Sequence, residues 1–585
     1  MDVLAELRTA TAPGADLALV VVPAGLGLAV PGRRWAVPGD AAGSAALLAR
    51  LEELLRPRWT WWAAAGAVGR LPDPLPHLAR CHDVGAVHRL LAGGSREDPA
   101  ACWAAAHGLP QPPPPARRPA PLHGTGLLDL DGGDDGEPVG DDGQLAPAWS
   151  QGRALGEAEP AEQVVRAARW AALALEVAQR QARAVAALPE HRRRPGGPPL
   201  GVQTAHAESA AALLAVELER TGLPLERATA EGLLERAAGP RPASAAEEAR
   251  LRAVRDAPVR RALGAGEVDL RNPAQVLGAL RGLGFDLPDT RAWRLEQFRH
   301  AHPAVEALLS WRKAERIATT YGWSWLDTAV GADGRLRGAW SASDAAAGRM
   351  TAQAGLHNLP AELRPAVAAE PGSVLVRADL GQVEPRVLAA VSADAALTAA
   401  TRDDDLYAPV AAALAADRPT AKVAVLAAMY GQTSGAAGEA LQRMERAYPT
   451  ALGYLRAAEE AGREGRDVRT YGGRLVRVGA PAPGEVGAAT AARGRFARNA
   501  VVQGAAAELF KAWAATVRAG LSGSAGRIVL CLHDELLLHV PAGEAERAAA
   551  LLVGALEQTA GRWAAGSGVR FVADVSVVRR WSEAK

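Results

Sequence analysis

The stretch SVLVRADLGQVEPRVLAAVS, residues 373–392, constrains the fold of this chain more than any other segment. Residues 374–376 are an apolar run of strand formers that continues to Asp379. Residues 380–382 break the run, and Glu384-Pro385 then opens a helical pattern with proline in the first turn. The sequence therefore predicts a buried strand that ends in a carboxylate just before a helix. Taken alone, Asp379 is most simply a helix-capping residue, but a carboxylate placed there is costly unless it is paired or binds a cation.

A second acidic side chain is expected in a similar setting. Residues 527–532 (RIVLCL) and 535–540 (ELLLHV) are two apolar runs, and His533-Asp534 between them is a tight hairpin turn. Asp534 alone could be only a turn residue. Two carboxylates on adjacent strands, however, repel each other unless cations lie between them. A pair of Mg²⁺ ions about 4 Å apart serves in-line phosphoryl transfer in many enzymes.

A third element fits phosphate chemistry. Four side chains recur at every fourth position and so share one face of a helix that Gly431 ends: Arg418, Lys422, Leu426 and Tyr430. Phosphates could bind at the basic end of this face and a base at the aromatic end. The competing interpretation is an amphipathic helix with a solvated basic end.

Composition limits the class of protein. A chain of 585 residues, 49% of them hydrophobic, can form several domains. Its net charge is +1, so affinity for nucleic acid would have to come from local arginine surfaces. No apolar run is long enough to span a membrane, no export signal is evident, and the three cysteines fit no metal or disulfide spacing. We therefore expect a cytoplasmic protein.

Along the chain, residues 1–108 predict a small α/β domain, and the Pro-, Gly- and Asp-rich residues 109–148 predict a disordered linker. A second linker is expected at 189–199. Helices are expected at 161–187 and 208–220, and further helices from there to about residue 326. Residues 395–465 should be mostly helical, and a last helix is expected at 544–563. Strands are expected at 335–340 and 569–578.

Taken together, these motifs resemble those of family A DNA polymerases, the polymerase I type. ADLGQVEPRVLAA (378–390) is similar to the first palm motif of the family, the Arg418–Gly431 pattern to its fingers helix, and LHDEL (532–536) to its last palm motif. Three further matches follow the family order, namely GRMT (348–351), LHNLP (356–360) and Arg495-x-x-x-Asn499-x-x-x-Gln503-Gly504, and TYGGR (470–474) also fits. The resemblance covers roughly residues 205–585.

This resemblance implies an α/β multidomain chain with a right-hand polymerase architecture. Residues 201–330 would form the thumb, 331–393 the first part of the palm, 394–495 the fingers and 496–585 the second part of the palm. Residues 1–200 would form a degenerate ribonuclease H-like 3′–5′ exonuclease-type α/β domain. The implied activity is that of a DNA-directed DNA polymerase that extends a primer with dNTPs in DNA repair or replication, as a monomer associated with the nucleoid and without a membrane partner.

The resemblance also implies a role for each motif residue. Asp379 and Asp534 would hold two Mg²⁺ ions, and Glu535 would support that site. Arg418 and Lys422 would grip the incoming triphosphate, with Lys422 as a possible proton donor to pyrophosphate, and Glu384 would exclude a ribose 2′-OH. The remaining expected contacts are to the nucleotide, from Leu426, Tyr430, Gln382 and Tyr407, and to DNA, from Arg349, Arg495, Asn499, Gln503, His533 and Arg386.

The sequence departs from the family pattern in several places. Leu426 stands where the family has Phe or Tyr, which predicts weaker stacking on the incoming base, by about 1 kcal/mol. Leu380-Gly381 replaces the usual Tyr-Ser, and Tyr407 stands where histidine is common. In the N-terminal region, the strand expected at 17–23 lacks the Asp-x-Glu of family exonucleases, and the expected Tyr-x-x-x-Asp falls on residues 170–174 without its acid. We therefore expect no proofreading activity.

Three alternatives compete with a DNA polymerase. The first is a polymerase that retains 3′–5′ exonuclease activity. The second is a phage-type RNA polymerase, which Glu384 argues against. The third is a non-catalytic DNA-binding relic of a polymerase, and retention of Asp379, Asp534, Arg418 and Lys422 argues against it.

Overall fold

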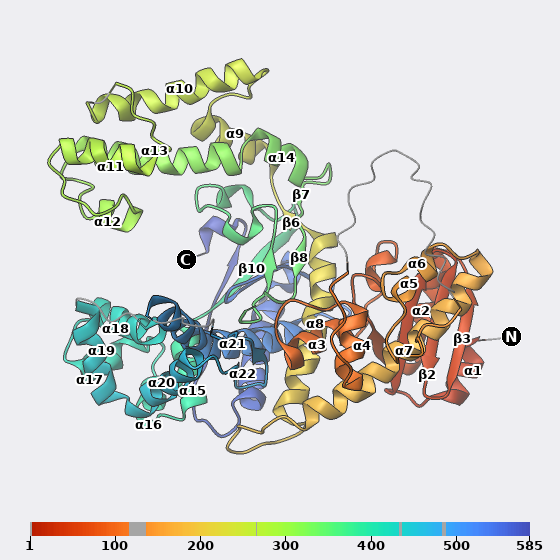
Figure 1. Ribbon diagram of the computed structural model, residues 1–585. Coiled ribbons are helices and arrows are strands. Elements are labelled where there is room, and N and C mark those ends of the chain that lie inside the picture. The colour runs from red at the N-terminus through yellow and green to blue at the C-terminus, as the bar shows by residue number, and fades with distance from the viewer. Residues whose placement is uncertain are drawn as a thin grey trace. The chain divides into compact units, whose positions relative to one another are not determined.

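The computed structural model describes residues 3–115, 136–264, 266–344, 346–431, 436–481 and 487–584 (Figure 1). The chain divides into two compact units. The first comprises residues 1–220, 340–351 and 376–576, and the second comprises residues 221–339, 352–375 and 577–585. Helix α8 (Leu200–Thr221), which the sequence analysis placed in the thumb, therefore lies almost entirely in the first unit.

The N-terminal part of the first unit is built on a five-stranded sheet of order β3-β2-β1-β4-β5. Its strands are β1 (Asp16–Val22), β2 (Gly25–Val30), β3 (Arg33–Pro38), β4 (Arg58–Trp61) and β5 (Arg80–Asp83). β1 pairs antiparallel with β2 and parallel with β4. Residues 1–108 thus have the mixed α/β structure predicted for them, within a unit that also includes residues 340–351 and 376–576.

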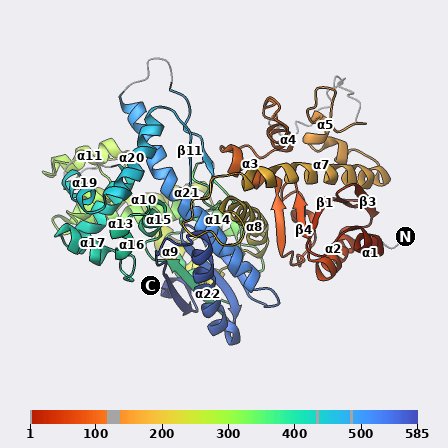
Figure 2. The ribbon, with the colours of Figure 1, turned by 90° about the horizontal axis from the view of Figure 1, so that it is seen from below.

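Side chains of β1 alternate between two cores on opposite faces of this sheet. Leu17, Leu19 and Val21 pack with helix α2 (Ala41–Leu55), whereas Ala18 and Val20 pack with the long helix α7 (Pro160–Ala186). Figure 2 shows α7 along one face of the sheet and α1 (Val3–Ala10) and α2 on the other. The short helices on this part of the chain are α3 (Val84–Ala92), α4 (Pro99–His107), α5 (Pro147–Ser150) and α6 (Arg153–Gly156).

The predicted linker at 109–148 is only partly correct. Residues 116–135 lie outside the described residues, but residues 136–148 are folded. Val139 and Leu145 form an isolated β-bridge, Leu145 is buried, and Trp103 Nε1 donates a hydrogen bond of 2.8 Å to the Gly143 carbonyl. Order in this polar segment comes from contacts with α4 and α7 that are distant in sequence, so its composition was misleading.

A four-stranded sheet of order β13-β14-β10-β15 forms the centre of the remaining part of the chain. Its strands are β10 (Ser373–Leu380), β13 (Arg527–Leu532), β14 (Glu535–Pro541) and β15 (Ala573–Val578). The predicted strand before Asp379 and the predicted hairpin are confirmed. β15 begins later than the strand predicted at 569–578, and the strand predicted at 335–340 is two short strands, β7 (Arg335–Leu336) and β8 (Trp340–Ser341).

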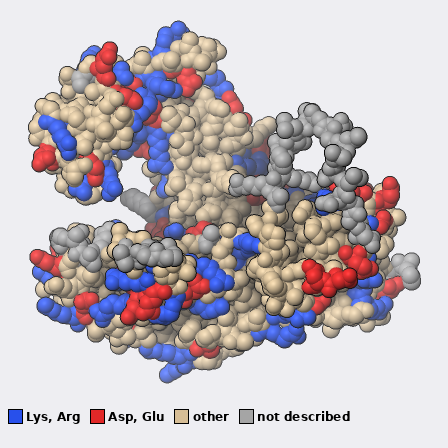
Figure 3. Space-filling view, viewed as in Figure 1, with Lys and Arg blue, Asp and Glu red and all other residues tan. Residues whose placement is uncertain are grey.

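Helices surround this sheet in the first unit. The predicted helix of the basic face is confirmed as α18 (Arg418–Tyr430), which Asp417 caps through the Thr420 N–H and which Gly431 ends in a left-handed conformation. The other helices are α15 (Val383–Ser392), α16 (Ala395–Ala400), α17 (Tyr407–Leu414), α19 (Ala436–Ala447), α20 (Pro449–Arg463), α21 (Ala488–Gly520) and α22 (Ala545–Trp563). Lys, Arg, Asp and Glu are intermingled over α17–α19 on the face drawn in Figure 3, in keeping with the near-zero net charge.

The second unit is mostly helical, as predicted for the segment up to residue 326. Its helices are α9 (Arg227–Ala238), α10 (Ala245–Ala262), α11 (Pro273–Gly282), α12 (Ala292–Glu296), α13 (Pro303–Thr320) and α14 (Trp323–Ala329). Val276, Leu280, Leu295 and Leu308 are fully buried in its core. Among the described residues, no helix is both long and apolar enough to cross a membrane.

Candidate active site

The two predicted metal-binding carboxylates come together at the end of β10. The Leu380 N–H donates a hydrogen bond of 2.9 Å to the Asp534 carbonyl, and the Gly381 N–H donates one of 2.9 Å to Val572 just before β15. His533 takes a left-handed backbone conformation with φ of 57°, which turns the chain tightly between β13 and β14. Strand order and turn geometry therefore place Asp379 beside Asp534 and Glu535.

The carboxylates of this cluster raise the free energy of one another's ionised forms. Burial, and then the charge of Asp534, raise the pKa of Asp379 to about 6. Burial also raises the pKa of Asp534. A cation between the two would relieve both penalties, and carboxylate oxygens suit Mg²⁺. Two carboxylates are a partial ligand set, however, and no cluster of three or more His, Cys, Asp or Glu ligands occurs in the part of the chain that the structure describes.

Sequence reasoning missed Arg377. Its Nη2 lies 2.7 Å from Asp379 Oδ2, and its Nε lies 2.9 Å from Glu535 Oε1. Burial lowers the pKa of Arg377, but the charges of Glu535, Asp379 and Asp574 reverse this effect, and the pKa is raised overall. The signal in the sequence is its position two residues before Asp379, because residues i and i+2 of a strand share one face.

Tyr430 and Glu384, predicted to act on the nucleotide, are in contact. The Tyr430 hydroxyl donates a hydrogen bond of 3.1 Å to Glu384 Oε2, and Gln503 also lies in hydrogen-bonding reach of that hydroxyl. Burial, followed by the charge of Glu384, raises the pKa of Tyr430 to about 12, and burial raises the pKa of Glu384. Asp534 and Arg349 both act electrostatically on Glu384, so this group adjoins the carboxylate cluster.

The basic end of α18 is held by an aspartate that sequence reasoning also missed. Arg418 Nε lies 2.5 Å from Asp405 Oδ2, and the Arg418 guanidinium stands 5.6 Å from the centre of the Tyr407 ring. Gln382 accepts a hydrogen bond of 3.0 Å from the Leu406 N–H, which fixes this loop. Lys422, one turn further along α18, is exposed. Leu426 and Tyr430 are half-buried, so the face is graded as predicted.

The residues predicted to contact DNA lie in different settings. Arg349 pairs with Asp344 at 3.3 Å and is 45% exposed. His533 and Arg495 are exposed, and Asn499 and Gln503 are half-buried on α21. Arg349, His533 and Arg495 are therefore accessible to a ligand, whereas the Asn499 side-chain oxygen is buried.

The predicted DNA contact of Arg386 is wrong. Its side chain is fully buried and donates hydrogen bonds to backbone carbonyls of three separate segments. These acceptors are the carbonyls of Gly381, Thr401, Asp403, Asp404 and Arg570, at 2.6–3.0 Å. Arg386 thus fixes the loop that carries Asp405, and it does not present its charge to a ligand.

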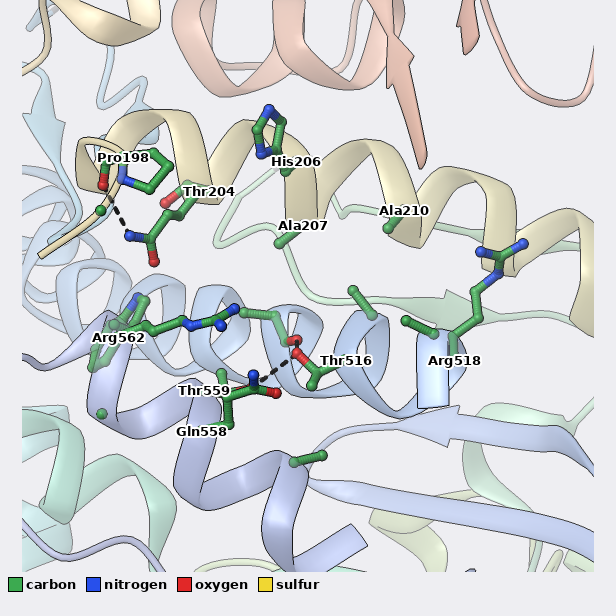
Figure 4. Close-up of a pocket in the computed structure, with 18 of the residues that line it drawn as sticks. Pro198, Thr204, His206, Ala207, Ala210, Thr516, Arg518, Gln558, Thr559 and Arg562 are labelled. Carbon is green, nitrogen blue, oxygen red and sulfur yellow. Dashed lines mark hydrogen bonds between the residues drawn. The ribbon is translucent and has the colours of Figure 1, made fainter. Parts of the chain in front are cut away.

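The first unit also contains a cavity of about 1120 Å³ that none of the predicted site residues lines. Figure 4 shows it between α8 on one side and α21 and α22 on the other. Thr516 and Thr559 hydrogen-bond to each other across the two last helices at 3.1 Å. Arg518 at its wall is neutralised by Glu217 at 2.5 Å. The residues that line the cavity do not include any carboxylate of the Asp379 cluster, so the two are separate features.

The comparisons with known proteins agree with this arrangement. The family model described as DNA polymerase family A matches residues 283–583, just over half of the chain. The chain belongs to DNA polymerase family A. It is 30% identical over 318 residues to DNA polymerase I of Chloroflexus aurantiacus, a match that covers 49% of this chain and 33% of that protein.

A further family A relative is the thermostable DNA polymerase I of Thermus aquaticus, 30% identical over 290 residues, with 45% of this chain and 35% of that protein covered. The chain therefore spans about a third of the length of these curated relatives. Among solved structures, the fold matches the POL domain of Pol1 from M. smegmatis in complex with DNA primer-template and dNTP. That match has a TM-score of 0.66 and 19% identity, and covers 97% of this chain and 95% of that one. The right-hand polymerase fold is thus established.

Proposed function

We propose that this protein is a template-directed DNA polymerase that adds dNTPs to the 3′-hydroxyl of a DNA primer, in DNA repair or replication. The observation that carries the proposal is the Asp379–Asp534 pair, which adjoins a graded face of α18 in a chain of DNA polymerase family A. The relatives are named DNA polymerases, and the solved structure with the same fold holds primer-template and dNTP.

Asp379 and Asp534 would hold two Mg²⁺ ions. When bound, these ions would lower the pKa of the attacking hydroxyl and stabilise the leaving oxygen. Burial of both carboxylates, with their raised pKa values, supports a site that requires a counter-cation to be fully ionised. Glu535, held through Arg377, would keep the cluster in place.

Arg418 and Lys422 would bind the triphosphate. Lys422 is exposed, and the only ion-pair partner found for Arg418 among the described residues is the carboxylate of Asp405, so a phosphate could replace that partner. Gln382 and Tyr407 would shape the loop below the phosphates. Glu384, fixed by Tyr430, would occupy the space of a ribose 2′-OH, and Tyr430 with Leu426 would adjoin the base.

Arg349, Asn499 and Gln503 would contact the minor groove of the primer end, where hydrogen-bond acceptors lie in similar places for every correct pair. Arg495 and His533 would make supporting DNA contacts. The Asn499 side-chain oxygen is buried and has no hydrogen-bond partner in the described structure, which fits a side chain that acquires one on binding.

We also propose that the enzyme lacks 3′–5′ proofreading. The positions where exonuclease acids are expected form an apolar core instead. Ala18 and Val20 of β1 pack with Trp170 and Ala174 of α7, and the Trp170 ring stacks on Trp62 at 4.5 Å between centroids. Apolar side chains packed in a core cannot bind the metal ions that a 3′–5′ exonuclease needs. We therefore expect that the exonuclease activity is absent.

The test is extension of a labelled primer–template with Mg²⁺ and four dNTPs. Asp379→Ala should abolish extension, whereas the control variant Asp333→Ala should not, because Asp333 lies in an exposed turn and makes contacts local to that turn, an ion pair with Arg337 and a hydrogen bond from the Arg335 N–H. A lane without dNTPs tests the second part of the proposal. Absence of extension by the wild-type protein would refute the polymerase, and shortening of the primer would show that proofreading survives.

A further inference from the structure

Three carboxylates, of Asp379, Glu535 and Asp574, contact the Arg377 guanidinium near the carboxyl end of β10. Arg377 and Asp379 lie on the same face of this strand, because they are two residues apart. Strand β10 lies between β14 and β15 in the sheet. Glu535 therefore reaches Arg377 from one neighbouring strand and Asp574 from the other, at 2.9 and 3.9 Å.

We propose that Arg377 is a positioning residue that acts as a built-in counter-cation for the carboxylate cluster, in competition with the divalent cations. Its Nη2 lies 2.7 Å from Asp379 Oδ2, an oxygen that a cation could otherwise bind. The proposal rests on the proposed function, since the competing cations are those of the polymerase site.

Burial makes this contact consequential. The Arg377 side chain is only 12% exposed, Glu535 is 12% exposed and Asp379 is 33% exposed. An arginine cannot lose its proton at working pH, so the positive charge stays in the cluster. Ion pairs with this burial are strong because water screens them little.

Two consequences follow from a fixed positive charge. Without metal, Arg377 neutralises part of the mutual repulsion of Asp379, Asp534 and Glu535, so the sheet end stays folded. With metal, the guanidinium repels the arriving divalent cation and shares a ligand oxygen with it. Arg377 therefore makes the site stable when empty and lowers its affinity for the cation.

The experiment measures Mg²⁺ binding to the full chain by isothermal titration calorimetry, and the melting temperature in EDTA and in Mg²⁺. Arg377→Met should bind Mg²⁺ roughly tenfold more tightly than wild type, because one like charge at the site is removed. Its melting temperature in EDTA should fall, and the rise caused by Mg²⁺ should be larger than in the wild type. Arg377→Lys keeps the charge but cannot contact Asp379 and Glu535 at once. Its Mg²⁺ affinity and melting temperature should lie between those of the wild type and Arg377→Met.

Arg518→Met is the matched control. Arg518 is similarly buried, at 6% exposed, and pairs with Glu217 away from the cluster. This variant should melt at lower temperature but bind Mg²⁺ as the wild type does. Asp379→Ala should remove Mg²⁺ binding altogether, which would show that the calorimetric signal comes from the carboxylate cluster.

The outcomes separate this proposal from the proposed function. The role of Arg377 would be overturned if wild type, Arg377→Met and Arg377→Lys bound Mg²⁺ with equal affinity. If Asp379→Ala at the same time lost Mg²⁺ binding, the metal site itself would stand. Mg²⁺ binding that Asp379→Ala does not change, or no binding by any variant, would overturn the metal site as well. Tighter binding by Arg377→Met alone, with Arg518→Met unchanged, would support the proposal.

Discussion

A buried ion network that links α8 and α21 gives the sharpest prediction for stability. Glu208 on α8 lies 2.5 Å from Lys511 Nζ on α21 and 2.6 Å from Arg474 Nη2, and all three side chains are at most 3% exposed. Burial disfavours the Glu208 carboxylate, but the charges of Arg474 and Lys511, followed by hydrogen bonds from both, lower its pKa overall. The change we consider is Glu208→Gln, which removes the charge and keeps the size.

The cost can be worked from the two cations left behind. Lys511 can lose its proton, and because burial already lowers its pKa to about 8, this loss adds only about 1 kcal/mol at pH 7. Arg474 cannot lose its proton, and loss of a charge-assisted contact costs about 1.5–3 kcal/mol. The sum of about 2.5–4 kcal/mol overlaps the roughly 3–5 kcal/mol typical of a broken buried pair.

Hydrogen exchange of peptides from α8 and α21 measures this loss, because local opening reports the stability of these helices without a two-state assumption for a chain of two units. The second change, Lys511→Met in the Glu208→Gln background, removes one of the two unpaired buried cations and should restore part of the lost stability. The control Glu557→Gln removes an exposed carboxylate on α22 and should stay within about 0.5 kcal/mol of wild type. Unchanged protection of α8 and α21 in Glu208→Gln would refute the reasoning.

Three further predictions concern activity and pH. Leu426→Phe should lower the KM for dNTP about fivefold, because stacking gains about 1 kcal/mol, and a KM that is unchanged or higher would contradict this. Glu384→Ala should admit ribonucleotides, and the ratio of kcat/KM for dNTP and NTP measures it; unchanged sugar discrimination would exclude the assignment. Burial raises the pKa of Glu508 to about 7, above the roughly 4.3 of free glutamate, so the folded protein holds a proton that the unfolded chain loses. Protection of α21 should therefore fall as pH rises from about 4 to about 7, and Glu508→Gln should flatten that slope; a slope equal to wild type would place the titration elsewhere.

Local signals predicted the elements that carry the chemistry. The strand before Asp379, the hairpin at Asp534 and the bounds of α18 follow from periodicity, capping and turn residues within a few positions of each other. What the sequence could not show is which charges are already paired. Arg386 has the composition of a DNA contact, but its acceptors come from loops near residues 381, 403 and 570, and only the fold brings these together.

The same limit explains the missed residues and the misjudged linker. Asp405 lies against Arg418 because Gln382 and Arg386, which come before α16 in the chain, hold its loop. Residues 136–148 are ordered because they hydrogen-bond to Trp103 and pack against α7, although their composition is that of a disordered segment. In each case, contacts between segments far apart in sequence decide the outcome.

Two charges of the candidate site are paired within the chain itself, Arg418 with Asp405 and Asp379 with Arg377. Under the proposed function, a phosphate would replace Asp405 and a cation would compete with Arg377. The two exchanges differ in difficulty. Arg418 is 54% exposed and Asp405 37%, so water screens their pair and a phosphate displaces it at little cost. The Arg377 contacts are buried, and displacing them requires a charge as concentrated as a divalent cation. Under the proposed function, binding of cations to the carboxylate cluster would therefore be more demanding than binding of the triphosphate.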